Sequence, residues 1–137
     1  MWGMKLQLSR IHQRQLLAWA AEAGVYECCG LLLGREDTVE KVELTLNVAD
    51  NPMYEFEIDP LALIAAEKRA RQGGPSILGY FHSHPNGIAE PSIKDAQMAA
   101  ADGRRWLIIA DGRITSWRPV GIAVNAVSFE LEGFNEG

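Results

Sequence analysis

The order of helical and strand-like segments is the feature of this sequence that most restricts its fold. Three segments with helical periodicity interrupt a series of short apolar strands, and they do not alternate regularly with those strands. Regular alternation is typical of a parallel sheet, whereas this order favours a curved, mixed, largely antiparallel sheet flanked by about three helices. The sequence therefore predicts an α+β fold.

Each expected helix has a recognisable start. Ser9 is the expected N-cap of a helix from about Ile11 to Ala23. Asp59-Pro60 supplies an N-cap and a first helical residue for a second helix, which ends at Gly73-Gly74. A third helix is expected from Ser92 to about Ala101. The expected strands are Lys5–Leu8, Leu31–Gly34, Val39–Val48, Tyr54–Ile58, Ile77–Phe81, Trp106–Ala110, Ile114–Arg118 and one within Ala123–Leu131.

Length and charge exclude several classes of protein. The 137 residues suffice for one hydrophobic core, and no linker or repeat divides them, so residues 1–137 are expected to form a single domain. No apolar run approaches the ~20 residues of a membrane span, and no secretory signal is visible at the N-terminus. Thirteen basic and eighteen acidic residues give a net charge of −5, whereas nucleic-acid binders usually carry a basic excess. We therefore expect neither nucleic acid nor membrane as a partner.

The two cysteines, Cys28 and Cys29, are adjacent in the sequence. Neighbouring cysteines rarely bridge each other, because a disulfide needs Cα atoms farther apart than one peptide unit allows. We therefore expect two small buried side chains and no disulfide, which fits a reducing, cytoplasmic location.

Two of the three histidines, His82 and His84, follow directly after the expected strand Ile77–Phe81. Residues two apart on a strand point to the same face, so both imidazoles can converge on one ion. Zn²⁺ accepts imidazole nitrogens at ~2.0–2.1 Å in tetrahedral geometry. The alternative is that both histidines are ordinary half-exposed polar residues.

Asp95 is the best candidate for a third ligand, because the helix that begins at Ser92 must fold back after the loop between Pro85 and Pro91. Three protein ligands leave the fourth zinc position for water, which is typical of a catalytic site. Zinc would lower the pKa of that water to ~7. Ser92-x-x-Asp95 is also a plausible capping box, and Asp95 could serve both purposes.

Two motifs, about fifty residues apart, together resemble one protein family. His82-Ser83-His84-Pro85, six residues, Ser92, two residues and Asp95 match the His-x-His-Pro-x6-Ser-x-x-Asp motif of the JAMM (MPN-plus) zinc metalloproteases. The segment from Glu27 to Gly34, ECCGLLLG, is similar to the family's upstream Glu-x-Cys-Gly-x-Leu-x-Gly. The short chain resembles the small prokaryotic members most.

The resemblance implies a cytidine-deaminase-like JAB/MPN fold and one Zn²⁺ per chain, held by His82, His84 and Asp95. It also implies that Glu27 accepts a proton from the zinc water and passes it to the leaving amine. Ser92 would donate a hydrogen bond to the oxyanion. Without the resemblance, Glu27 is an ordinary acid that precedes two cysteines.

The resemblance further implies a substrate class. Small bacterial and archaeal members resemble peptidases that act on ubiquitin-like sulfur-carrier proteins, so we expect hydrolysis after a C-terminal Gly-Gly. One alternative is an isopeptidase that removes a ubiquitin-like modifier from lysine, and another is a non-catalytic MPN scaffold. A RadC-like protein, associated with DNA repair, is disfavoured by the Glu27 segment and by the acidic charge.

Two further expectations concern packing. A glycine inside a strand often marks close backbone approach, which is the expected role of Gly30 and Gly79. An edge strand near Val124 to Leu131 offers a pairing surface for a second copy in a homodimer, unless a helix covers it.

Overall fold

The computed structural model describes residues 5–123 and 126–136. Along the chain, its elements are β1 (Leu6–Gln7), α1 (Arg10–Ala23), β2 (Cys29–Arg35), β3 (Thr38–Thr45), α2 (Pro60–Arg71), β4 (Ser76–Ser83), α3 (Ile93–Met98), β5 (Arg105–Ala110), β6 (Arg113–Ala123), β7 (Ala126–Glu132) and β8 (Phe134–Asn135). None of the described helices is long and apolar enough to cross a membrane.

All the described strands belong to one sheet with the order β7-β6-β5-β4-β2-β3-β1-β8. The pairs β2–β3, β2–β4, β5–β6 and β6–β7 are antiparallel. The pair β4–β5 is parallel, as are the short contacts of β1 with β3 and β8. The predicted α+β class, with a mixed and largely antiparallel sheet and three helices, is confirmed.

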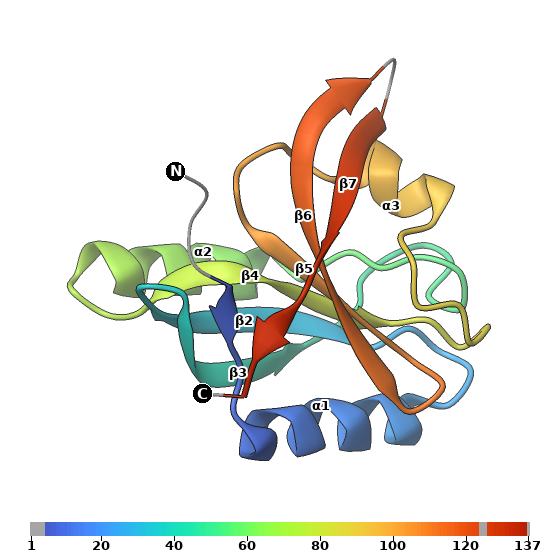
Figure 1. Cartoon of the computed structure of the whole chain (residues 1–137), viewed down its shortest axis with the longest axis horizontal. Helices are drawn as coiled ribbons and strands as arrows, with labels where there is room; N and C mark the ends of the chain where they lie inside the picture. The colour runs from blue at the N-terminus through green and yellow to red at the C-terminus, as the bar shows by residue number, and fades with distance from the viewer. Residues whose placement is uncertain (1–4, 124–125, 137) are drawn as a thin grey trace.

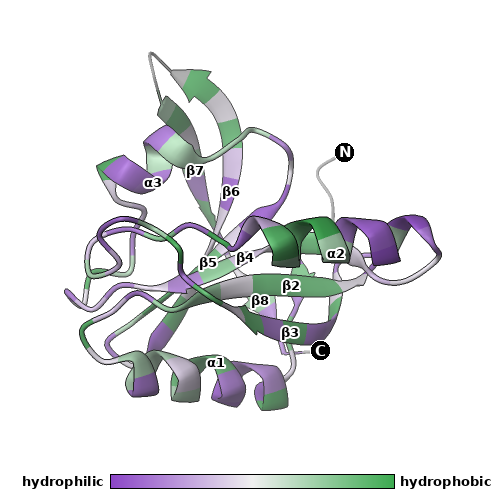
Figure 2. Ribbon diagram, turned by 180° about the vertical axis from the view of Figure 1, so that it is seen from behind, coloured by the Kyte–Doolittle hydropathy of each residue, from purple (hydrophilic) through white to green (hydrophobic). Residues whose placement is uncertain are grey.

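The two long helices lie on opposite faces of the sheet (Figure 1). Alternate residues of β2 explain this arrangement, because successive strand side chains point to opposite faces. Leu32 packs in the cluster that contacts α1 through Leu16, whereas Leu31 and Leu33 pack in the cluster that contacts α2 through Ala66. Figure 2 shows the apolar residues of β2 and of the facing part of α2 in green.

The third helix and the β6–β7 hairpin form a separate region of the fold. The hairpin projects beyond the rest of the sheet, and α3 packs against β7 (Figure 1). The sheet order leaves β7 as an edge strand. Val124, where the expected edge strand begins, lies outside the described residues.

The predicted helix starts are confirmed. The Ser9 hydroxyl accepts a hydrogen bond from the His12 N–H, and the Asp59 carboxylate accepts one from the Leu61 N–H. The third helix is shorter than expected and ends at Met98. The strand from Val39 ends at Thr45, three residues before the predicted Val48, and β8 was not predicted.

The prediction of a strand at Tyr54–Ile58 is wrong. Residues 54–57 form a turn and an irregular segment, and Ile58 makes only an isolated bridge to Asn47. The alternation of apolar and acidic residues is real, since Phe56 is buried and Glu57 is exposed. The Asn47 side chain donates to the Glu55 carbonyl and accepts from the Glu57 N–H, and these bonds, with backbone bonds to Val48 and Asn51, hold the segment without a regular strand ladder.

The two strand glycines have the predicted role. A Cβ on Gly30 would collide with the Glu43 carbonyl and the Phe81 ring, and a Cβ on Gly79 would collide with the Arg105 carbonyl. Glycine is therefore needed where β2 and β4 approach their neighbours. Cys28 and Cys29 are free thiols, as expected; Cys29 is fully buried, whereas Cys28 is only half-buried and departs from the expected burial.

Candidate active site

Three polar side chains converge at the end of β4. The Nε2 atoms of His82 and His84 lie 2.9 Å apart, and the Asp95 Oδ2 atom lies 3.1 Å and 3.0 Å from them. All three residues are buried, with 0%, 5% and 2% of their surfaces exposed. The strand places both imidazoles on one face, and the fold-back of the 85–92 loop brings in Asp95, as the spacing predicted.

A hydrogen bond outside the cluster orients each of two side chains. His84 Nδ1 donates to the Ile88 carbonyl at 2.7 Å, so Nε2 is the ring nitrogen that faces the cluster. Asp95 Oδ2 accepts from the Ser92 N–H at 2.9 Å, and the Ser92 hydroxyl accepts from the Asp95 N–H at 3.0 Å. This is the predicted capping box at the start of α3. Asp95 therefore both caps the helix and faces the histidines.

Burial and hydrogen bonding set the charges of the cluster. Burial lowers the pKa of His82 more than its hydrogen bond to Asp95 raises it. Burial also opposes charge on His84, but its hydrogen bonds to Asp95 and Ile88 outweigh burial and raise its pKa. Burial disfavours the Asp95 carboxylate too, yet the bonds from His82, His84 and the Ser92 N–H hold its pKa well below the usual range. The cluster thus combines an anionic oxygen with imidazole nitrogens.

Glu27 completes the group from the junction between α1 and β2. One carboxylate oxygen of Glu27 and one nitrogen from each of His82 and His84 lie within 4.8 Å of one another. Glu27 is 6% exposed, and its Oε1 atom has no hydrogen-bond partner among the described residues. Burial raises its pKa to about 7; His84 opposes the rise, and Asp95 and Glu55 add to it. A carboxyl group with such a pKa can both accept and release a proton near neutral pH.

Aromatic rings enclose the inner side of the cluster. Phe56 stacks on His82 with ring centroids 4.1 Å apart and an interplanar angle of 21°. Trp106 contacts His82 edge-on at 5.6 Å and Phe56 at 5.3 Å. These rings remove His82 from water and restrict its orientation.

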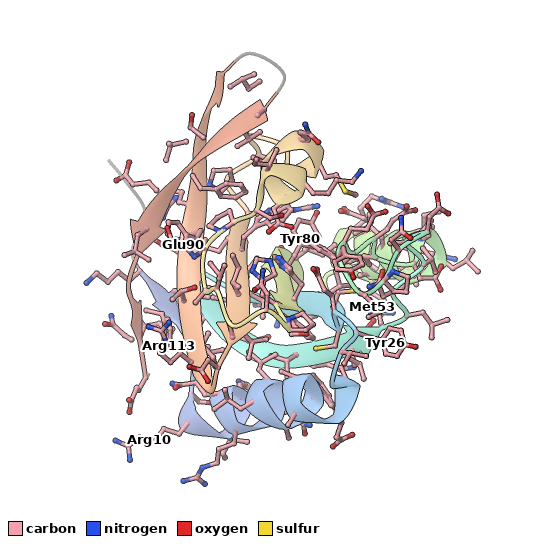
Figure 3. All side chains as sticks on the ribbon, turned by 90° about the vertical axis from the view of Figure 1, so that its right-hand side faces the viewer. Arg10, Tyr26, Met53, Tyr80, Glu90 and Arg113 are labelled. Carbon is pink, nitrogen blue, oxygen red and sulfur yellow. The ribbon has the colours of Figure 1, made fainter. Side chains whose placement is uncertain are left out.

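The outer side opens into a cavity of about 290 Å³. Glu27, His84 and Ser92 line it together with apolar residues, and its full lining is Val25, Glu27, Met53, Tyr54, His84, Pro85, Asn86 and Ser92. Figure 3 shows Tyr26 and Met53 on the same side of the molecule, and both are exposed. The polar cluster is therefore reached past an apolar wall, an arrangement typical of a binding pocket.

The donor set fits a divalent metal ion. The Nε2, Nε2 and Oδ2 atoms form a nearly equilateral triangle with sides of 2.9–3.1 Å. Its corners lie closer to its centre than ~2.0–2.1 Å, the usual zinc–ligand distance, so these three atoms could all contact one bound ion. Glu27 belongs to the same group but lies on the open side, where it faces the cavity.

The structure brings together all five residues singled out in the sequence: Glu27, His82, His84, Ser92 and Asp95. Reasoning from residue spacing alone found the histidines, Ser92 and Asp95, whereas Glu27 came only from the family resemblance. Phe56 and Asn47 were missed. Phe56 was assigned to a half-exposed strand, and Asn47 carried no signal beyond being a polar residue inside an expected strand.

A family model described as prokaryotic homologs of the JAB domain matches residues 9–120. The chain belongs to this family, and the expected small prokaryotic JAMM type is confirmed. The fold, the site and the family together define an enzyme, a peptidase or isopeptidase of the JAMM type.

Similar proteins agree with this assignment. The desampylase of Haloferax volcanii is 30% identical over 139 residues, which are 96% of this chain and 100% of the relative. A probable TtuB-protein conjugate cleaving protease of Thermus thermophilus is 36% identical over 117 residues, 79% of this chain and 74% of its own. A solved structure from Desulfitobacterium hafniense has a TM-score of 0.76 at 31% identity and covers 96% of this chain and 94% of its own.

Proposed function

We propose that this chain is a zinc-dependent metallopeptidase that hydrolyses the peptide bond after the C-terminal Gly-Gly of a ubiquitin-like sulfur-carrier protein. The observation that carries the proposal is the convergence of His82, His84 and Asp95 within about 3 Å of one another, beside buried Glu27. The whole chain acts as one domain in this proposal.

His82, His84 and Asp95 hold one Zn²⁺, because two imidazoles and one carboxylate are a common catalytic donor set for this ion. When bound, zinc supplies a Lewis acid and lowers the pKa of a water molecule to about 7. The Ile88 carbonyl keeps His84 Nδ1 protonated, so that Nε2 is the ligand atom.

Glu27 acts as the general base and then the general acid. Its buried Oε1 accepts a proton from the attacking water and returns it to the leaving amine. Ser92 already accepts a hydrogen bond from the Asp95 N–H, so its own O–H remains available to donate to the oxyanion.

The substrate class follows from the relatives and the cavity. The relatives named a desampylase and a TtuB-protein conjugate cleaving protease support cleavage of ubiquitin-like protein conjugates. A cavity of about 290 Å³ with an apolar wall, lined also by Glu27, His84 and Ser92, has room for an extended tail. A narrow groove beside the zinc would favour Gly-Gly, because any side chain there would clash. The proposed location is the cytoplasm, where the two thiols stay reduced.

A second candidate is isopeptide hydrolysis, in which the leaving amine is a lysine side chain. The name of the Thermus relative, a conjugate-cleaving protease, favours it. Two substrates separate the candidates: a carrier extended by a few residues after Gly-Gly, and the same carrier joined through Gly-Gly to a lysine. Faster cleavage of the extended carrier supports the peptidase, and faster release from lysine supports the isopeptidase.

The test of the site itself is zinc content. We expect close to one zinc per chain in the wild type, and loss of that zinc in His84→Ala and in Asp95→Ala, with both variants folded by circular dichroism. A wild type that takes up no zinc when the ion is supplied would instead indicate a non-catalytic scaffold. A homodimer formed through the β7 edge stays a prediction, to be checked by light scattering.

A further inference from the structure

The Asn47 side chain, just after β3, makes four hydrogen bonds that use all its polar capacity. Its Nδ2 group donates to the carbonyls of Glu27 at 2.9 Å and Glu55 at 3.0 Å. Its Oδ1 atom accepts from the N–H groups of Ala49 at 3.1 Å and Glu57 at 3.0 Å. Two carbonyls on one side and two N–H groups on the other fix the orientation of the amide.

One of these bonds holds the backbone of the proposed base. Glu27 lies between α1 and β2, outside any helix or strand, so no regular ladder fixes it. Its carbonyl is held by Asn47, and its N–H donates to the Pro52 carbonyl at 2.8 Å. The next residue, Cys28, donates to the Ser83 hydroxyl at 2.9 Å and accepts from the Ser83 N–H at 3.0 Å. Ser83 therefore attaches this junction to β4, and Asn47 attaches it to the 47–57 segment.

The other bonds hold the backbone on both sides of Phe56. The Glu55 carbonyl and the Glu57 N–H, one before and one after Phe56, both bond to Asn47. The Phe56 ring stacks on His82. A single amide thus connects the backbone of Glu27 to the segment that packs against a proposed zinc ligand.

We propose that Asn47 is a positioning residue that fixes Glu27 relative to His82 and His84. The inference rests on the proposed function, because it assigns to Glu27 the role of base. Neither test substitution reproduces the contacts, because aspartate lacks both donors and alanine lacks every polar atom of the side chain. Displacement of a catalytic group by about 1 Å can cost roughly a hundredfold in rate.

The kinetic test compares Asn47→Ala and Asn47→Asp with Asn51→Ala. Asn51 lies in the same segment, and its exposed side chain makes no hydrogen bond to the described residues. With a Gly-Gly-extended carrier, we expect both Asn47 variants to lower kcat by roughly tenfold to a hundredfold, with KM changed less than about threefold and zinc content kept. Asn51→Ala should match the wild type.

A double-mutant cycle separates positioning from general destabilisation. If Asn47 acts through Glu27, adding Asn47→Ala to Glu27→Gln lowers the residual kcat little further. If the two losses multiply, Asn47 acts elsewhere and the proposal is overturned.

Amide hydrogen exchange needs no substrate, so it tests the positioning role of Asn47 even if the proposed peptidase activity is wrong. In Asn47→Ala, amide hydrogen exchange at Glu27, whose N–H donates to the Pro52 carbonyl in the segment that Asn47 holds, should be at least about tenfold faster, beyond any change in global stability, whereas exchange at Leu107 in β5 should stay close to wild type. Unchanged exchange at Glu27 would overturn the positioning role. A wild type that cleaves no Gly-Gly substrate would refute the proposed function alone, and the exchange experiment would still decide the role of Asn47.

Discussion

At the scale of single residues, Glu27 is a buried carboxyl group whose Oε1 atom has no hydrogen-bond partner among the described residues. Burial raises its pKa from 4.5 to about 7, against the effect of His84 and with additions from Asp95 and Glu55. A carboxyl group whose pKa is higher in the folded than in the unfolded state costs stability once it ionises. The cost begins as the pH rises above about 4.5 and is complete above about 7.

We therefore predict that Glu27→Gln stabilises the zinc-free protein at pH 8, by of the order of 1–3 kcal/mol, while abolishing most peptidase activity. The gain should shrink as the pH falls toward 5, because both folded and unfolded states then hold the proton. Urea unfolding with a chelator present, between pH 5 and pH 8, measures this difference. A variant less stable than the wild type at pH 8 would show that Glu27 has a stabilising partner.

Only some of these residues could be read from the sequence. His82 and His84 were predictable because the strand period fixes which side chains share a face, and Asp95 because a capping box fixes a helix start. Glu27 and Asn47 lie in irregular backbone, where no period applies. Their positions depend on hydrogen bonds to Pro52, Glu55 and Glu57, which are set by the folded chain.

At the scale of elements, α3 has only six residues and depends on its cap. Such a short helix has little stability of its own, so the Ser92–Asp95 box and packing against β7 must hold it. Ser92 thus has a structural role beside its proposed catalytic one.

We predict that Ser92→Ala lowers the free energy of unfolding by about 1 kcal/mol. It should also lower kcat by roughly a hundredfold to a thousandfold, through loss of the oxyanion donor. Ser92→Thr keeps a hydroxyl and should recover much of the lost stability and much of the lost kcat. Denaturant unfolding and steady-state kinetics on the same preparations separate the two effects. An Ala variant with normal kcat would remove Ser92 from the mechanism.

Strand β4 carries His82 and leads directly to His84, and it depends on Gly79 for its pairing with β5. We predict that Gly79→Ala destabilises the fold by about 1–3 kcal/mol or more, because the new Cβ meets the Arg105 carbonyl. Gly121→Ala in β6 is the matched control, since a Cβ there meets no described atom within 4 Å. Thermal unfolding of both variants measures the difference. Equal melting temperatures would mean that β4 and β5 can move apart to accommodate the new Cβ without a loss of stability.

The elements were predicted well where apolar periodicity and capping residues coincide. Helices α1 and α2 and the core strands follow from these signals. Apolar and acidic residues alternate in the 54–57 segment as they do in a strand, but this alternation indicates only which side chains are buried. Besides backbone bonds to Val48 and Asn51, the backbone of this segment is bonded by the Asn47 side-chain amide, and a side-chain partner of this kind leaves no periodic pattern in a sequence.

At the scale of the whole molecule, Arg105 joins parts of the sheet that are distant in strand order. It begins β5 and is 5% exposed, and it pairs with Asp37 in the β2–β3 turn and with Glu132 at the end of β7. Glu132 also pairs with Arg118 of β6. The sheet must curve strongly for one guanidinium to reach both carboxylates.

We predict that Arg105→Ala destabilises the protein by about 3–5 kcal/mol, because it leaves two partly buried carboxylates without this cation. Arg105→Met, which retains the apolar stem, should recover part of the loss. Denaturant unfolding at low and high salt provides the measurement. If the free energy of unfolding fell by less than about 1 kcal/mol, the ion pairs of Arg105 with Asp37 and Glu132 would contribute no more than ordinary surface ion pairs do.

The capping box at the start of α3 has a consequence for how such chains change over generations. One oxygen of Asp95 both caps the start of α3 and faces the two histidines. A descendant that abandons hydrolysis is released from keeping the histidines, but it still needs an acceptor for the Ser92 N–H. Such descendants would keep the aspartate after they lose hydrolytic activity, so its presence alone would not indicate an active enzyme. The histidine pair and the buried glutamate would be the markers that distinguish a working enzyme from an inherited scaffold.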